Sequence, residues 1–183
     1  MAALLHELLA AASVAGRTAV GLVFIMAATQ KAMHWRILPG VIANYRLLPR
    51  WAAWPAAALL PPAEMILSIL LLSAQFQPWP ALGTIALLAL FAAAMAINIR
   101  RGRDHIDCGC GESFLRQTLS WTLVVRNGLL AALLVPSLAM TAPMSVALAL
   151  SGVAAGLSLF LLYLLLNVLA ALPPVEARGH RFA

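Results

Sequence analysis

The sequence predicts an all-α integral membrane protein: a four-helix transmembrane bundle, a fifth transmembrane helix and a short interfacial helix in the first loop. Two observations support this prediction. The 183 residues are 63% hydrophobic and 10% charged, whereas a soluble domain is about 45–50% apolar and about 25% charged. Five apolar runs are also long enough to cross a bilayer, which takes about 20 residues per helix. We expect a single transmembrane domain over residues 1–183.

Tryptophans and prolines mark the ends of the five spans. Tryptophan prefers the membrane–water interface, and all five tryptophans of the chain fall near a proposed span end. Prolines mark the breaks between apolar runs, because they interrupt regular structure. The predicted spans cover residues 11–33, 52–73, 79–99, 118–139 and 144–171.

The first loop is expected to form a short helix between Pro39 and Pro49. Its apolar residues share one helical face. They are Val41, Ile42, Tyr45 and Leu48. Such a helix can cover the cysteines of the third loop, or it can lie on lipid as an amphipathic connector. The sequence leaves both interpretations open.

The fifth span carries two features suited to helix packing. Gly152 and Gly156 have the small-xxx-small spacing that permits close approach of two helices. We interpret them as a contact within the bundle rather than as a partner site. Asn167 lies farther along the span, and we expect it to hydrogen-bond to a neighbouring helix.

Positive charge is concentrated in three segments that share one side of a five-span protein. These segments are the first loop, the third loop and the C-terminal tail. They hold Lys31, Arg36, Arg46, Arg50, Arg100, Arg101, Arg103, Arg116, Arg178 and Arg181. By the positive-inside rule this side is cytoplasmic. The net charge of +6 therefore reflects membrane topology, and nucleic-acid binding is not expected.

The two cysteines of the chain, Cys108 and Cys110, lie in a polar loop over residues 100–117. A disulfide with one residue between its cysteines is strained and easily reduced. Strained, exposed disulfides tend to be catalytic or regulatory. Two alternatives stay open: a Cu(I) or Zn site made by His105, Cys108 and Cys110, and a cysteine pair that only shapes the loop.

Charged residues inside spans are costly and usually functional. Glu64 is expected to pair with an intramembrane arginine, Arg126 in preference to Arg17. One interpretation is an ion pair that fixes helix register. The other is a polar pocket beneath the cysteine loop that holds a quinone head group or relays a proton, formed by Glu64, Arg126, Asn127 and His34.

Four stretches of the chain resemble the MauE family of methylamine utilisation proteins, which belongs to the DoxX/DoxD-like membrane proteins. They are NYRLLP, LPPAE, NIRRGRDHIDCGC and LSWTLVVRNGLL. The similarity runs from about Gly21 to Leu134, and its most specific part surrounds the two cysteines. The fifth span and the tail match nothing distinctive.

The resemblance implies a multi-pass protein of the bacterial inner membrane that assists the maturation of methylamine dehydrogenase. The small subunit of that enzyme is exported and rich in disulfides. MauE-like proteins are thought to help form these disulfides beside a thioredoxin-like partner, MauD. By carry-over, Cys108 and Cys110 form the catalytic redox pair. Glu64, Arg126 and Asn127 match the remaining polar motif positions.

Two kinds of activity follow from the resemblance. In the first, the protein is a thiol–disulfide oxidoreductase that passes electrons to a membrane quinone. In the second, it is a non-enzymatic membrane scaffold, or a chaperone handling Cu(I) or Zn, for the same maturation.

The charge pattern and the resemblance disagree about the face that carries the cysteine loop. The count of positive residues places the loop in the cytoplasm. A client oxidised outside the cytoplasm favours the external face, where disulfides persist. Because Arg100, Arg101 and Arg103 adjoin the cysteine motif, they are weaker evidence for orientation. On the functional argument we expect the external face.

Overall fold

The computed structural model describes residues 1–106, 118–139 and 145–171. The predicted all-α fold is confirmed: within these described ranges five helices are long and apolar enough to cross a membrane, and a short helix lies in the first loop. The helices are α1 (Ala2–Met33), α2 (Leu38–Asn44), α3 (Arg50–Leu72), α4 (Trp79–Arg100), α5 (Trp121–Leu133), α6 (Pro136–Ala139) and α7 (Val146–Ala171).

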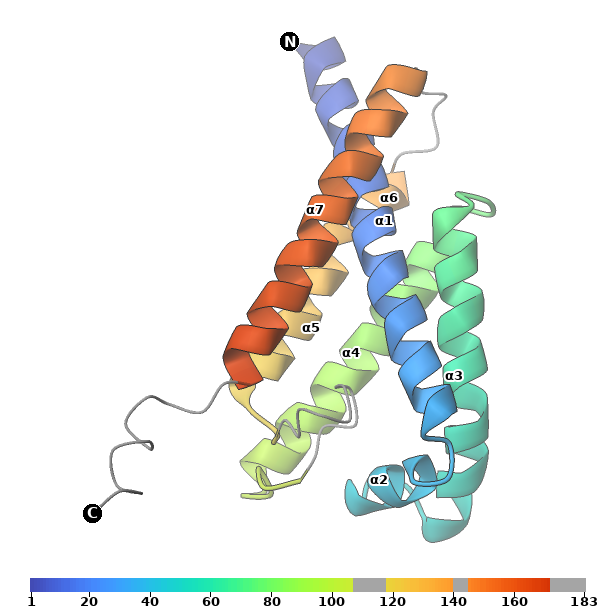
Figure 1. Cartoon of the computed structure of the whole chain (residues 1–183), viewed down its shortest axis with the longest axis vertical. Coiled ribbons are helices and arrows are strands. Elements are labelled where there is room, and N and C mark those ends of the chain that lie inside the picture. Colours follow the sequence, from blue (N-terminus) through green and yellow to red (C-terminus); the bar gives the residue numbers. More distant parts are fainter. Residues whose placement is uncertain (107–117, 140–144, 172–183) are drawn as a thin grey trace, which may run out of the picture.

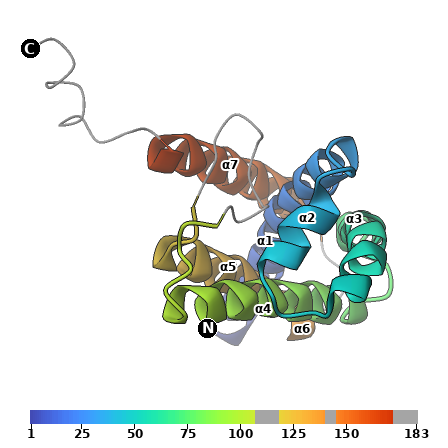
Figure 2. The same cartoon turned by 90° about the horizontal axis from the view of Figure 1, so that it is seen from below.

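The long helices run in alternating directions, so several helix ends meet at one end of the bundle (Figure 1). The C-terminal ends of α1, α4 and α7 gather there with α2 and the beginnings of α3 and α5. We call this the loop end of the molecule. Viewed from the loop end, α2 lies across the end of α1 and beside α3 (Figure 2). The first and third loops therefore share one side, as the sequence predicts.

Two of the five predicted spans differ from the observed helices by more than two residues at an end. α1 begins at Ala2 rather than at residue 11, because the first ten residues contain neither glycine nor proline to interrupt a helix. The fourth predicted span is divided. Its first residues are not helical, since the Leu119 N–H donates to the Ile106 carbonyl at 3.1 Å. α5 ends before Pro136, which lacks the N–H needed to continue the helix.

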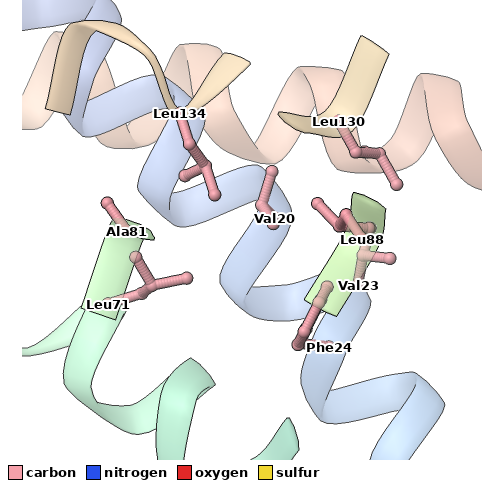
Figure 3. Close-up of a cluster of buried hydrophobic side chains, with 8 residues drawn as sticks. All are labelled: Val20, Val23, Phe24, Leu71, Ala81, Leu88, Leu130 and Leu134. Carbon is pink, nitrogen blue, oxygen red and sulfur yellow. The ribbon is translucent and has the colours of Figure 1, made fainter. Parts of the chain in front are cut away.

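A cluster of buried apolar side chains joins four of the spans in the middle of the bundle. Figure 3 shows these side chains pointing toward one another from α1, α3, α4 and α5. They are Val20, Val23, Phe24, Leu71, Ala81, Leu88, Leu130 and Leu134. Lipid tails are as apolar as leucine, so close van der Waals packing rather than water exclusion holds such helices together.

α7 packs against α1 through the two glycines of its small-xxx-small pattern. A Cβ atom added to Gly156 would lie 2.5 Å from Thr18 Cβ, and one added to Gly152 would lie 2.7 Å from Val14 Cβ. Both distances are far shorter than a normal carbon–carbon contact, about 3.5–4.0 Å. The predicted role of these glycines in packing within the bundle is confirmed.

Candidate functional site

A buried ion pair joins α1 to α3. The Lys31 ammonium donates to both carboxylate oxygens of Glu64, with Nζ 2.8 Å from Oε1 and 3.0 Å from Oε2. The two side chains are 7% and 1% exposed. Nζ also lies 5.6 Å from the centre of the Phe91 ring, which belongs to α4. Three helices therefore meet at one cation.

The predicted partner of Glu64 was wrong. Neither Arg126 nor Arg17 makes the ion pair with this carboxylate; Lys31 does. The physical reason is the direction of helical side chains, which point back toward the N-terminus of their helix. Lys31 lies in the last turn of α1, so its long side chain extends inward from the helix end. The Arg17 side chain also points toward the N-terminus of α1, where Nε donates to the Ser13 carbonyl at 3.3 Å. This direction takes it away from the end of α1 where Lys31 meets Glu64.

Arg126 of α5 is directed toward α7 instead. Its Nη1 donates to Asn167 Oδ1 at 2.5 Å, and its guanidinium lies 5.5 Å from the centre of the Tyr163 ring. The expected hydrogen bond between Asn167 and a neighbouring helix is thus confirmed. The neighbouring Asn127 is buried and donates to the Leu123 carbonyl of its own helix at 2.8 Å.

His34 closes the C-terminal end of α1. Its Nδ1 lies 3.0 Å from the Gln30 carbonyl, and the side chain is half-buried. His34, Arg126 and Asn127 do not line the cavity described next. The grouping of these three residues with Glu64 around one pocket therefore stays a prediction.

An apolar cavity of about 380 Å³ lies between α2 and the bundle, and we call it the α2 cavity. It is lined by Lys31, Leu38, Val41, Ile42, Tyr45, Leu47, Leu48, Ala56, Leu60, Leu90, Phe91, Ala94 and Met95. The four apolar residues predicted to share a helical face, 41, 42, 45 and 48, form one wall. α2 ends at Asn44, so only Val41 and Ile42 of these belong to the helix, and Tyr45 and Leu48 follow it. α2 and the residues after it therefore cover the α2 cavity.

Both ends of the cysteine-bearing segment are fixed at the loop end. Ile106 and Leu119 are buried in a cluster with Met95 and Leu123, against Tyr45 and Phe91. Their backbones are joined by the Leu119 N–H and the Ile106 carbonyl, as described above. Residues 107–117, with Cys108 and Cys110, lie outside the described residues, so the predicted redox pair and the alternative metal site with His105 are not tested.

Arg103 ties the cysteine-bearing segment to α2. It donates to the Asn44 carbonyl at 2.7 Å, to the Tyr45 carbonyl at 3.4 Å and to Asn98 Oδ1 at 3.1 Å. These carbonyls are at the C-terminal end of α2, where the last carbonyls of a helix need donors and the helix dipole favours a cation. One guanidinium thus holds α2, α4 and the start of the loop together.

Sequence reasoning missed two of these residues. The charge pattern groups Lys31 with the positive loops, although it lies inside the first predicted span. Its position there was the signal that it could be an intramembrane charge. Arg103 was assigned to topology and to the cysteines. No pattern in the sequence shows that it reaches the first loop, because Arg103 and Asn44 are 59 residues apart in the chain.

The fold and site define a multi-pass helical membrane protein whose buried ion pair, apolar cavity and loop anchors lie close together. The sequence pattern of the family described as "Methylamine utilisation protein MauE" matches residues 9–142. The chain therefore belongs to the MauE family.

Similar proteins cover nearly the whole chain. It is 38% identical over 163 residues to a methylamine utilization protein MauE of Paracoccus denitrificans, spanning 87% of this chain and 88% of the relative. It is 36% identical to one of Paracoccus versutus, with 86% of each chain covered. For one of Methylorubrum extorquens the identity is 38% over 78% of each chain. No solved structure matches.

Proposed function

We propose that this protein is a thiol–disulfide redox protein of the bacterial inner membrane that helps an exported enzyme to form its disulfides. The client is the small subunit of methylamine dehydrogenase, the partner is a thioredoxin-like protein of the MauD type, and the electrons go to a membrane quinone. Family membership supports a role in methylamine utilisation. The chemistry is argued from the cysteines and their setting.

The observation that carries the proposal is the anchoring of the cysteine-bearing segment beside the α2 cavity. Tyr45, Phe91 and Met95 line that cavity and also pack against Ile106 and Leu119. A chain advances at most about 3.6 Å per residue. Cys108 follows Ile106 by two residues in the sequence, and this short connection supports a redox pair that acts beside the cavity.

The reaction consists of three steps, each of which balances. First, a thiolate of the reduced partner attacks the Cys108–Cys110 disulfide, giving a mixed disulfide. The second partner thiol resolves it, so the partner is oxidised and the cysteine pair is reduced. The cysteine pair then gives two electrons and two protons to the quinone. This step re-forms the disulfide and yields the hydroquinone. The oxidised partner passes its disulfide to the client.

Serine substitutions test the proposal. Cys108→Ser and Cys110→Ser should each abolish disulfide formation in the client, because the couple needs both sulfurs, while membrane levels of the protein stay normal. Ser113→Ala in the same loop serves as the control. The readout is the redox state of the client cysteines after alkylation. Client oxidation that continues in either serine variant would replace the redox function by the scaffold role.

A further inference from the structure

We infer that the α2 cavity is the binding site of the quinone, with the Lys31 ammonium donating a hydrogen bond to one quinone carbonyl. The inference deepens the proposed function and rests on it for the choice of a quinone among neutral apolar ligands. It names a site made by α1, α2, α3 and α4, in place of one that includes Arg126 and Asn127.

The size and lining of the cavity suit an apolar small molecule. Its volume of about 380 Å³ lies in the range of small-molecule sites, about 300–1,000 Å³. Such sites are mostly apolar and contain a few placed polar groups. Here the side chains are aliphatic or aromatic apart from the Lys31 ammonium and the Tyr45 hydroxyl.

The charges around the cavity favour a neutral ligand with a hydrogen-bond acceptor. An ammonium has three N–H donors, and Glu64 receives two of them. The third can bind a carbonyl oxygen. The Glu64 carboxylate already neutralises the cation and repels an anionic head group. A lipid tail alone would leave the third donor without an acceptor, which is costly away from water.

The aromatic and lipid-facing parts of the wall complete the fit. Phe91 lines the cavity beside the ammonium and offers a ring face on which a flat quinone ring can pack. Leu90 and Leu48 also line the cavity, yet they are 62% and 48% exposed on the outer surface. The rim therefore opens toward lipid, where an isoprenoid tail can extend.

The position of the cavity also suits electron transfer from the cysteine pair. As described above, three of its wall residues belong to the cluster that holds the two ends of the cysteine-bearing segment. A ring bound against Phe91 is thus separated from these anchors by the side chains of that cluster. The head group then lies at the loop end of the bundle rather than in its middle.

Binding of decylubiquinone to the purified full chain tests the inference. The measurement uses the double variant Cys108→Ser/Cys110→Ser, so thiol chemistry cannot contribute. Adding Ala94→Leu fills the cavity and should weaken binding by about tenfold or more, because an overfilled site excludes the ring. Ala93→Leu, on the exposed neighbouring position of α4, should leave binding unchanged. Thermal unfolding of both variants checks that they fold alike.

A second comparison tests the hydrogen bond. Lys31→Met combined with Glu64→Gln removes the donor without leaving a lone charge. Affinity for decylubiquinone should fall by about tenfold or more, while affinity for decylbenzene, which has no carbonyls, should not change.

Equal decylubiquinone binding by the Ala94→Leu and Ala93→Leu variants would overturn the inference, as would decylbenzene binding as tightly as decylubiquinone. Failure of the proposed function is recognised separately, in the client oxidation assay. Quinone binding that meets the expectations here supports the site whatever that assay shows.

Discussion

Lys31 and Glu64 show how a single long side chain sets the character of a membrane site. The lysine lies near the end of its helix, where a cation is usually taken to point outward to the interface. Its ammonium instead extends inward to a carboxylate that is 1% exposed. The two opposite charges neutralise each other in an apolar setting. The Lys31 ammonium remains as a polar group in the wall of the α2 cavity.

Breaking this ion pair should strongly destabilise the protein. Lys31→Met or Glu64→Gln leaves an uncompensated buried charge or donor, which costs roughly 3–5 kcal/mol. The double variant should recover a large part of that loss. Thermal unfolding in detergent of the wild type, both singles and the double gives the coupling energy between the two residues.

The matched control is Arg126→Gln, alone and combined with Glu64→Gln. Because Arg126 bonds to Asn167 rather than to Glu64, its effect should add to that of Glu64→Gln. Non-additivity of this second pair, together with additivity of the first, would restore the arginine as the partner.

At the scale of single residues the sequence identified Glu64 and Arg126 as intramembrane charges, but not Lys31 and not the partner of either residue. Glu64 and Arg126 stand out because charged residues are rare in apolar runs. Which helix faces which other helix is a tertiary property, and the sequence alone does not show that α1 brings Lys31 beside Glu64 while α5 brings Arg126 beside Asn167. The hydrogen bond of Asn167 could be predicted, because a polar residue in an apolar span needs a partner. The sequence did not show that this partner is Arg126.

At the scale of helices, the close contact of α7 with α1 depends on Gly152 and Gly156, which have no side chain. Gly156→Ala places a methyl group 2.5 Å from Thr18 Cβ, so the helices must separate. We expect a loss of about 1–3 kcal/mol in stability. Gly128→Ala in α5 is the matched control, because nothing lies within 4 Å of the added methyl group. It should be neutral or slightly stabilising, since alanine favours helix more than glycine. Thermal unfolding that ranks the two variants in the opposite order would refute this packing.

α2 is held in place at its C-terminal end by Arg103. Arg103→Ala removes three charge-assisted hydrogen bonds, each worth about 1.5–3 kcal/mol in favourable cases. Hydrogen exchange of the α2 amides should become faster by about tenfold or more, with the five spans unchanged. Arg101→Ala, an exposed position in the same turn, is the control. Equal exchange in the two variants would show that α2 does not depend on this arginine.

The helices themselves were largely predictable, because lipid exposure requires long apolar runs and interfaces attract tryptophan. The spacing of four apolar residues predicted a first-loop helix, but the helix ends at Asn44, before Tyr45 and Leu48. That these residues line a cavity could not be predicted from the spacing. The beginning of the fourth span was misjudged because the pairing of Leu119 with Ile106 is a contact across the cysteine-bearing segment. Apolar composition alone cannot show that contact.

At the scale of the whole molecule, the open question is which face of the membrane carries the loop end. Chemical labelling of the cysteines answers it. A membrane-impermeant maleimide, added to intact spheroplasts after mild reduction, should label Cys108 or Cys110. The reason is that the proposed client is oxidised outside the cytoplasm, where disulfides persist. The double serine variant is the control for background labelling. Labelling that appears only after the membrane is broken would place the loop inside, as the excess of Lys and Arg indicates.

The link between Lys31 and Glu64 also bears on how the chain enters the membrane during synthesis. α1 leaves the ribosome before α3, so the lysine reaches the bilayer ahead of its carboxylate partner. A lone charge at the centre of an inserting helix costs about 2.5–3.5 kcal/mol. Glu64 lies near the middle of α3, so this cost is offset when α3 inserts beside α1 and its lysine. α1 and α3 are therefore most favourably inserted as a hairpin. The segment between them, with α2 in it, then takes its place at the loop end before α4 and α5 are made.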